Sequence, residues 1–208
     1  MNRLDRFIRD RRLREVARRL PKGARVLDVG CHDGTLFFQL GDDLAEGLGL
    51  DPALEQTVDS SRYQLRPGRF PADAPPEPSA FDVVTMVAVF EHLTAEEQRA
   101  AAREAFRLLR PRGLVVMTVP SPTVDRLLDG LIRLRLLHGM DPEAHHGFDP
   151  VAVIPMFVDA GFRLSRHRRF ELGLNNLFVF ERPGPDAAPV AGGSAGLAGG
   201  SSGPPTTV

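Results

Sequence analysis

Residues 26–34 read Val26-Leu27-Asp28-Val29-Gly30-Cys31-His32-Asp33-Gly34. An apolar run that enters a glycine turn before a helical segment predicts a buried parallel strand, a tight turn and a helix. Gly30 suits a close approach, because a side chain there would collide with a ligand lying over the strand end. Gly34 lets the helix begin close to the strand. Asp28 places a carboxylate beneath the turn, where it orders the loop or faces a cationic group of a ligand.

A second acidic residue follows at a distance that is typical of nucleotide sites. Asp51 ends the next apolar run, 21 residues after Gly30. In doubly wound folds an acidic residue at this point binds a ribose diol, whereas an isolated Asp before a proline is more often a turn former. The spacing Gly30-x-x-x-Gly34, with His32 in place of the middle glycine, is not the dinucleotide fingerprint. We therefore expect a nucleoside ligand without a pyrophosphate.

Hydrophobic periodicity predicts alternating strands and helices that end in a hairpin. This order indicates an α/β fold, a doubly wound sheet with one antiparallel edge. Strands are expected at residues 25–30, 46–50, 68–71, 81–89, 114–119, 162–170 and 174–181. Helices are expected at residues 2–20, 35–40, 53–60, 94–109, 124–137 and 150–160, with Thr94 and Glu97 forming a capping box and a turn at residues 110–113.

Composition places the chain among ordinary globular proteins. Its 208 residues are 42% apolar and 25% charged. The formal net charge of −1 argues against a nucleic-acid-binding surface that covers the whole molecule, although a local basic patch stays possible. A single cysteine excludes a disulfide within the chain and disfavours a cysteine-rich zinc site. No apolar run approaches the ~20 residues of a membrane span, and no signal-peptide core follows the start. A cytoplasmic enzyme or binding protein is the expectation.

Three segments differ in character. Residues 1–21 form an amphipathic, arginine-rich cap helix, residues 22–182 the main domain, and residues 183–208 a Gly/Pro/Ala/Ser-rich tail. The tail cannot bury enough apolar surface to fold, so we expect it to be disordered.

Five ordered motifs resemble those of the class I S-adenosylmethionine-dependent methyltransferases, in their small-molecule branch. They are LDVGCHDG, LGLDPA, FPADAP, FDVVTMVAVFEHL and FRLLRPRGLVVMTVP. The resemblance implies a Rossmann-like sheet of seven strands in the order 3-2-1-4-5-7-6, with strand 7 antiparallel and helices on both faces. It also implies S-adenosyl-L-methionine as cofactor and S-adenosyl-L-homocysteine as product.

The resemblance carries over to individual positions. Asp51 would hold the cofactor's ribose, and His32 departs from the family's usual glycine, at a cost of about 1 kcal/mol if that position needs a positive φ. The other cofactor-binding positions would surround the methionine part (Asp28, Gly30, Cys31, Gly34), flank the adenine (Pro52, Asp73, Ala74) or line the floor near the sulfonium (Ala88, Val89, Phe90).

Methyl transfer to oxygen or nitrogen can require a base, and histidine titrates near neutrality. His146 is the preferred candidate, with His145 and His92 as competitors. The alternatives are a solvated loop for the adjacent pair and a helix cap for His92. A zinc site built from these loop histidines with His138 and Asp141 fits no standard spacing, so no metal is expected.

The acceptor is expected to be a small organic molecule methylated on oxygen. The segment 89–92 differs from the Asn/Asp-Pro-Pro-Tyr/Phe motif of methyltransferases that act on amino groups of bases or glutamine, so no nucleic-acid partner is predicted. The basic first helix and the leucine-rich segment 124–137 suggest a hydrophobic or lipid-linked acceptor and contact with a membrane, although both helices could simply cover the site or the sheet. Two alternatives stay open: a nicotinamide oxidoreductase, and a methyltransferase fold that binds or regulates without catalysis.

Overall fold

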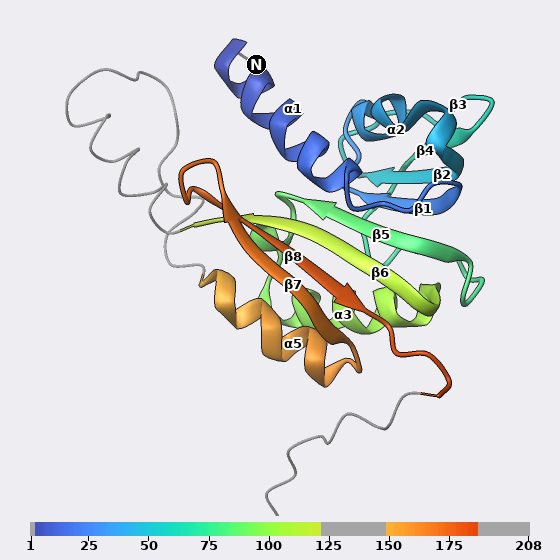
Figure 1. Ribbon diagram of the computed structural model, residues 1–208. Helices are drawn as coiled ribbons and strands as arrows, with labels where there is room; N and C mark the ends of the chain where they lie inside the picture. Colours follow the sequence, from blue (N-terminus) through green and yellow to red (C-terminus); the bar gives the residue numbers. More distant parts are fainter. Residues whose placement is uncertain (1–2, 122–148, 187–208) are drawn as a thin grey trace, which may run out of the picture.

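The computed structural model describes residues 3–121 and 149–186 and contains one mixed sheet. Its order is β3-β4-β2-β1-β5-β6-β8-β7 (Figure 1). The strands are β1 (Ala24–Val29), β2 (Leu44–Asp51), β3 (Val58–Asp59), β4 (Tyr63–Pro67), β5 (Phe81–Val87), β6 (Leu109–Pro120), β7 (Arg163–Phe170) and β8 (Asn175–Glu181).

The parallel part of the sheet runs from β4 through β2, β1 and β5 to β6. β8 lies antiparallel between β6 and β7, and β3 pairs antiparallel with β4 at the opposite edge. The seven expected strands therefore occur in the expected order, with the last of them antiparallel. The strand count was wrong by one, because the two-residue strand β3 adds an eighth.

Two predictions between β2 and β5 are wrong. The segment 53–60 forms no helix and contributes β3 instead, in which Val58 pairs with Leu65. Its Thr, Val, Asp and Ser residues restrict χ1 or compete for backbone hydrogen bonds, and both effects weaken a helix. The third parallel strand is Tyr63–Pro67 and not residues 68–71. We attribute its early end to Pro67, which lacks an N–H to extend the ladder.

A third difference concerns residues 110–113, which were expected to form a turn. They lie within β6, where the pairing with β5 shifts register between Phe81 and Val83. Arg112 takes a positive φ of 66° there. The irregularity accommodates the extra residues without ending the strand.

Helices cover both faces of the sheet (Figure 1). α1 (Arg3–Ala17) and α2 (Thr35–Leu40) pack on one face, and α3 (Ala95–Leu108) and α5 (Val153–Asp159) on the other. The described residues also include the 3-10 turns η1 (Gly41–Asp43), η2 (Phe90–His92) and η4 (Pro150–Ala152). Among the described residues, none of the helices combines the length and apolarity that crossing a bilayer requires.

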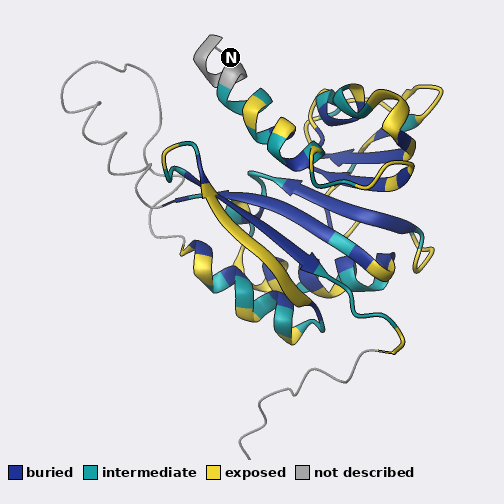
Figure 2. Ribbon diagram, viewed as in Figure 1, coloured by how far each residue is buried: buried dark blue, intermediate teal, exposed yellow. Residues whose placement is uncertain are grey.

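The two faces have different cores. On the α1 face, Leu13 and Val16 pack with a cluster that includes Val83 and Val116 of the sheet. On the α3 face the core is aromatic, and the Phe157 ring stacks on Phe180 at 4.5 Å. Figure 2 shows the central strands buried and β7 exposed along most of its length. Of the apolar residues in the first helix, Leu13 and Val16 face the sheet.

The start of α3 confirms the expected capping box. The Glu97 N–H donates to the Thr94 hydroxyl at 3.3 Å, and the Thr94 N–H donates to the Glu97 carboxylate at 2.8 Å. These two contacts satisfy helix N–H groups that would otherwise lack partners. The predicted helix at 124–137 and most of the predicted tail lie outside the described residues.

Candidate functional site

The glycine loop joins β1 to α2 at the carboxyl edge of the sheet. The Gly30 N–H donates to the Leu50 carbonyl at 2.8 Å, so the loop begins against β2. Gly30 has a positive φ of 74°, and a Cβ added there would overlap the Val89 side chain. The sequence predicted a close approach by a ligand at Gly30; in the structure the close neighbour is Val89, from the segment after β5.

The end of the loop also requires glycine. Gly34 has a φ of 73° and stands directly before α2, and a Cβ there would lie 3.1 Å from a Leu65 methyl. His32 has a φ of 49° and a side chain that is 66% exposed. The condition under which His32 was expected to cost about 1 kcal/mol more than glycine is therefore met, and its imidazole faces solvent.

Asp51 is the polar centre of the site. One carboxylate oxygen accepts the His32 N–H at 2.9 Å and the other accepts the Ala53 N–H at 2.8 Å. The residue is nearly buried, with 9% exposed. A carboxylate has about four acceptor positions, so this one can still accept from the two hydroxyls of a ribose. Pro52, beside it, is exposed.

The segment predicted to flank an adenine lies close to Asp51. The Gly68 N–H donates to the Asp51 backbone carbonyl at 3.2 Å. The Asp73 carboxylate accepts the Arg69 N–H at 2.7 Å, and a Cβ on Gly68 would lie 3.1 Å from the Asp73 Cβ. The structure thus brings Asp73 to the end of the strand pair that carries Asp51. Ala74 is partly buried against the α3-face core.

Asp28 is buried beneath the loop. The Thr85 hydroxyl donates to its carboxylate at 2.6 Å. Burial raises the pKa of Asp28 to about 7, the Thr85 hydrogen bond opposes the shift, and the charge of Asp51 adds to it. This hydrogen bond ties the Asp28 carboxylate to β5, while the two roles expected for it, ordering the loop or facing a cationic group of a ligand, stay predictions.

The segment after β5 forms the opposite wall. Ala88 has a positive φ of 55°, and its N–H donates to the Thr118 carbonyl at 3.0 Å. Val89 reaches the glycine loop. The Phe90 ring is fully buried, with its centroid 5.5 Å from that of Phe157. Ala88 and Val89 lie at the site edge, whereas the Phe90 side chain belongs to the core.

Cys31 packs inside the protein. Its thiol lies over Gly49 of β2, where an added Cβ would approach the sulfur to 2.6 Å. Burial raises the pKa of the thiol to about 12, and the charges of Asp28 and Asp51 add to the shift. A thiol that stays protonated is a poor nucleophile. The residue acts as a small packing group against β2.

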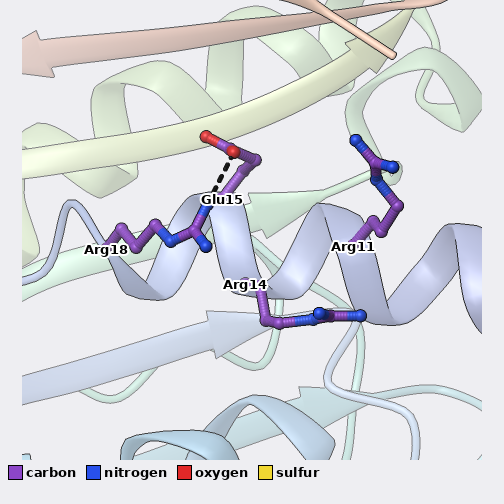
Figure 3. Close-up of a pocket in the computed structure, with 4 residues that line it drawn as sticks. All are labelled: Arg11, Arg14, Glu15 and Arg18. Carbon is purple, nitrogen blue, oxygen red and sulfur yellow. Dashed lines mark hydrogen bonds and ion pairs between the residues drawn. The ribbon is translucent and has the colours of Figure 1, made fainter.

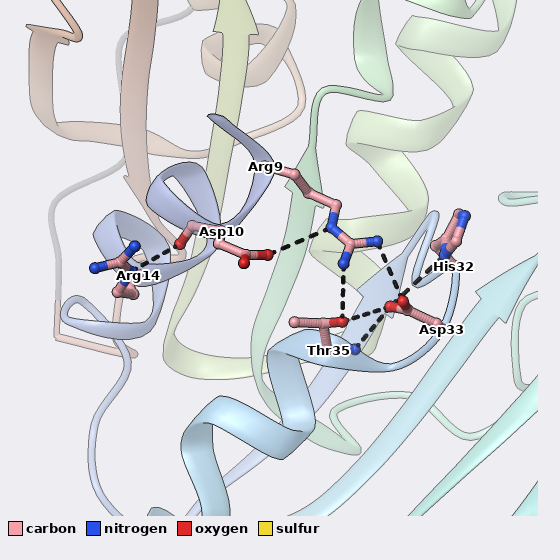
Figure 4. A network of polar contacts seen from close by, with 6 residues as sticks. All are labelled: Arg9, Asp10, Arg14, His32, Asp33 and Thr35. Carbon is pink, nitrogen blue, oxygen red and sulfur yellow. Dashed lines mark hydrogen bonds and ion pairs between the residues drawn. The ribbon is translucent and has the colours of Figure 1, made fainter. Parts of the chain in front are cut away.

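An ionic network ties α1 to the glycine loop (Figure 4). The Arg9 guanidinium lies 3.1 Å from the Asp33 carboxylate, which also accepts the Thr35 N–H at 3.2 Å and the Thr35 hydroxyl at 2.5 Å. Burial acts to raise the pKa of Asp33, but the Thr35 hydrogen bonds and the Arg9 charge outweigh it and lower the pKa. The first helix is therefore attached to the loop that follows β1.

The candidate bases fare differently. His92 lies in η2, which directly follows the wall formed by Ala88 and Val89, and it is exposed. His145 and His146 lie outside the described residues, as do His138 and Asp141. Within the ranges that the structure describes, no group of three metal-ligating side chains comes together.

Sequence reasoning did not select Glu91, which precedes His92. One oxygen of its carboxylate is buried without a hydrogen-bond partner. Burial raises the pKa of Glu91 to about 7, its own backbone N–H opposes the shift, and the charge of Arg12 also lowers it. An acidic residue at the end of an apolar strand motif is the signal that could have identified it.

Arg12 brings a second acidic residue to the same region. Its Nε lies 4.0 Å from the carboxylate of Glu171, in the turn between β7 and β8. The Asn175 amide donates to that carboxylate at 2.6 Å. α1 therefore places a cation between two acidic side chains at the carboxyl edge of the sheet.

The chain resembles curated proteins over part of its length. A "Ubiquinone biosynthesis O-methyltransferase" from Idiomarina loihiensis is 29% identical over 133 residues, covering 60% of this chain and 54% of that protein. The mitochondrial protein of the same name from Bos taurus is 28% identical over 158 residues, covering 69% of this chain and 42% of the relative. The chain spans about half the length of the curated relatives it matches.

Solved structures share the fold at low sequence identity. The PH0226 protein from Pyrococcus horikoshii has a TM-score of 0.64 at 18% identity, covering 87% of this chain and 92% of that one. The [4+2]-cyclase SpnF has the same TM-score at 17% identity, covering 84% and 81%. Because one of these proteins is a cyclase, the fold alone does not define the reaction.

The family itself is defined by a sequence model. The model for the methyltransferase domain matches residues 2–167, which include the glycine loop, Asp51 and the wall after β5. This match agrees with the five motifs recognised in the sequence. The chain belongs to the methyltransferase domain family.

Proposed function

We propose that the chain transfers a methyl group from S-adenosyl-L-methionine to a hydroxyl oxygen of a small organic acceptor. The observation that carries this proposal is the meeting of Asp51 with the glycine loop through the His32 N–H. The family match and the O-methyltransferase names of the curated relatives support the reaction type. The acceptor's identity does not follow from those names, because the chain spans only part of these relatives.

The described residues fit the cofactor. Asp51 offers a nearly buried carboxylate with unused acceptor positions, which suits a ribose diol. The loop from Gly30 to Gly34 would hold the methionine part, and Asp73 would lie by the adenine. When bound, the cofactor supplies a methyl group on a positively charged sulfonium. The wall formed by Ala88 and Val89 would face that end.

A base for the acceptor is the second part of the proposal. Glu91 follows this wall and carries a buried oxygen without a hydrogen-bond partner. With a pKa raised to about 7, the carboxyl is partly ionised at neutral pH and can take a proton from a hydroxyl. His92, His145 and His146 remain the predicted alternatives for the same role.

The proposal is tested in two steps. Calorimetry with S-adenosyl-L-homocysteine is expected to show binding by the wild type that Asp51→Ala weakens severely. Phenols, catechols, amines and carboxylic acids are then incubated with S-adenosyl-L-methionine and the protein, and mass spectrometry locates any added methyl group. Methylation of amines alone would overturn transfer to oxygen.

The two steps also separate the remaining outcomes. Absence of binding by a folded wild type would overturn the cofactor assignment. Binding of the cofactor product without turnover of any acceptor would favour the non-catalytic alternative. That alternative draws support from His32, which takes a positive φ at a position where the family usually has glycine.

A further inference from the structure

A row of arginines lies on the exposed side of α1. Arg11, Arg14 and Arg18 are exposed and line one shallow pocket of about 150 Å³ together with Glu15 (Figure 3). Their spacing of three and four residues places them on one side of the helix. Glu15, which lines the same pocket, pairs with Arg18 at 2.9 Å.

The edge strand β7 extends the same surface. Arg166 pairs with Val179 and Arg168 with Leu177, and both β8 partners belong to the core on the α1 face. Because facing residues of paired strands share a side of the sheet, both arginines lie on the α1 side. Arg168 also lies 3.5 Å from Glu15. Arg11, Arg14, Arg18, Arg166 and Arg168 together form what we name the arginine face.

A leucine projects at one end of this surface. The turn from β7 to β8 has a positive φ at Glu171 (51°) and at Leu172 (57°), closed by a hydrogen bond from the Gly173 N–H to the Phe170 carbonyl. Glu171 lies 3.7 Å from Arg11, which joins the turn to the arginine face. The Leu172 side chain is fully exposed, at 103%. A bulky residue at positive φ is strained, so the surrounding fold keeps Leu172 in a turn that exposes its apolar side chain.

We propose that the arginine face and Leu172 dock the protein on an anionic lipid surface. The arginines supply attraction to lipid phosphates, and Leu172 enters the boundary between headgroups and acyl chains. The turn that carries Leu172 lies at the carboxyl edge of the sheet, where the candidate site is built. Docking would therefore present that edge towards the membrane.

Two simpler explanations account for only part of the pattern. Charged residues on an edge strand prevent pairing with other chains, which explains arginines along β7 but not the row on α1. A nucleic acid would also attract the arginines, but a phosphodiester backbone offers nothing to a fully exposed leucine. The combination of the two features favours a lipid surface.

The test is flotation of the full chain with lipid vesicles at low and physiological salt. We expect binding to vesicles of phosphatidylcholine mixed with phosphatidylglycerol and none to phosphatidylcholine alone. The variant Arg14→Gln/Arg18→Gln/Arg166→Gln leaves the Arg11 and Arg168 ion pairs in place. It should lower the partition coefficient about a hundredfold, at roughly a factor of five per charge. Leu172→Gln should lower it about tenfold.

A matched control removes three arginines from elsewhere. Arg66, Arg99 and Arg103 are exposed on β4 and α3, away from the arginine face. Arg66→Gln/Arg99→Gln/Arg103→Gln has the same net charge as the test variant and should bind vesicles like the wild type. Circular dichroism checks that every variant is folded.

Three results would overturn the proposal. One is the absence of binding to anionic vesicles at low salt. Another is an equal loss in the control and test variants, which would indicate attraction by overall charge. The third is tighter binding of a short DNA duplex than of vesicles, with no effect of Leu172→Gln, which would favour nucleic acid. None of these results depends on cofactor binding or turnover, so the proposed function is tested separately.

Discussion

The carboxylate of Asp51 accepts the backbone N–H of His32 at 2.9 Å, across the two strand ends that form the site. The same carboxylate thus orders the glycine loop and remains available to a ribose. Asp51→Asn keeps the shape but loses the charge and one acceptor atom. We expect it to weaken S-adenosyl-L-homocysteine binding about tenfold, and Asp51→Ala to weaken it about a hundredfold. Calorimetry measures both, with Asp59→Asn on the exposed strand β3 as the control; equal affinities throughout would refute the ribose role.

Replacing His32 by glycine tests the backbone strain in the loop. His32 contributes its N–H to Asp51, while its side chain is largely exposed. His32→Gly should relieve the strain of the positive φ. Glycine also adds freedom to the unfolded chain, which opposes this gain, so the net stabilisation should be about 0.5–1 kcal/mol. Ser79→Gly, at a φ of 54°, is a matched control for strain remote from the cofactor. Thermal unfolding and calorimetry check that both variants gain stability and that neither loses affinity for S-adenosyl-L-homocysteine.

The contact between Gly30 and Val89 predicts a specific coupling. Gly30→Ala should destabilise the fold by about 2–4 kcal/mol, from the positive φ and from overlap with the valine. Adding Val89→Ala should recover the overlap part, which a double-mutant cycle in urea measures. Gly23→Ala is the control, because Gly23 has a φ of 70° but open space around it. A purely additive cycle would contradict the packing explanation.

The sequence predicted the parts of the site that depend on strand ends. Gly30, Gly34 and Asp51 follow from local signals, because an apolar run, a glycine turn and an acidic residue report their own places in the fold. Glu91 could not be identified in this way. Its burial, its unpartnered oxygen and its proximity to Arg12 arise only when α1 packs across the sheet.

The errors at the sheet edge have a similar cause. β3 is exposed on both residues, and β4 buries only Leu65 fully. Strands that bury so little of their surface show weak alternation of apolar and polar residues. The hydrophobic pattern of the sequence therefore does not indicate where these strands begin and end or which strand they pair with. The central strands β1 and β5 are mostly buried and were predicted close to their observed positions. β6 was predicted correctly only over its buried second half, because its exposed residues 110–112 resemble a turn.

Asp28 gives a prediction for stability against pH. Its pKa is raised by burial to about 7 in the folded protein, from an ordinary 3.8. The folded state therefore keeps a proton that the unfolded chain releases. This contribution to stability is complete below about pH 4 and is lost as the pH rises through about 7.

Asp28→Asn mimics the protonated side chain and keeps the contact with Thr85. Its stability relative to the wild type should rise by about 2–4 kcal/mol between about pH 4 and 8. Urea unfolding at several pH values measures the difference, with Asp59→Asn as the control. Parallel curves for wild type and Asp28→Asn would show that Asp28 is ionised in the folded protein throughout.

The raised pKa of Glu91 predicts how both turnover and stability depend on pH. If the ionised carboxylate takes the acceptor's proton, turnover of an acceptor found by the screen should rise with pH through about 7, the raised pKa of Glu91. Glu91→Gln should lower turnover at least a hundredfold and remove this rise.

The same variant should be more stable than the wild type above about pH 7 and similar to it near pH 4, because an ionised Glu91 is costly only in the folded protein. His92→Gln is the matched control for the neighbouring candidate base. If Glu91→Gln gains stability at high pH but keeps the wild-type pH–rate profile, the raised pKa of Glu91 is real and the base lies elsewhere. The predicted histidines are then the next to be tested.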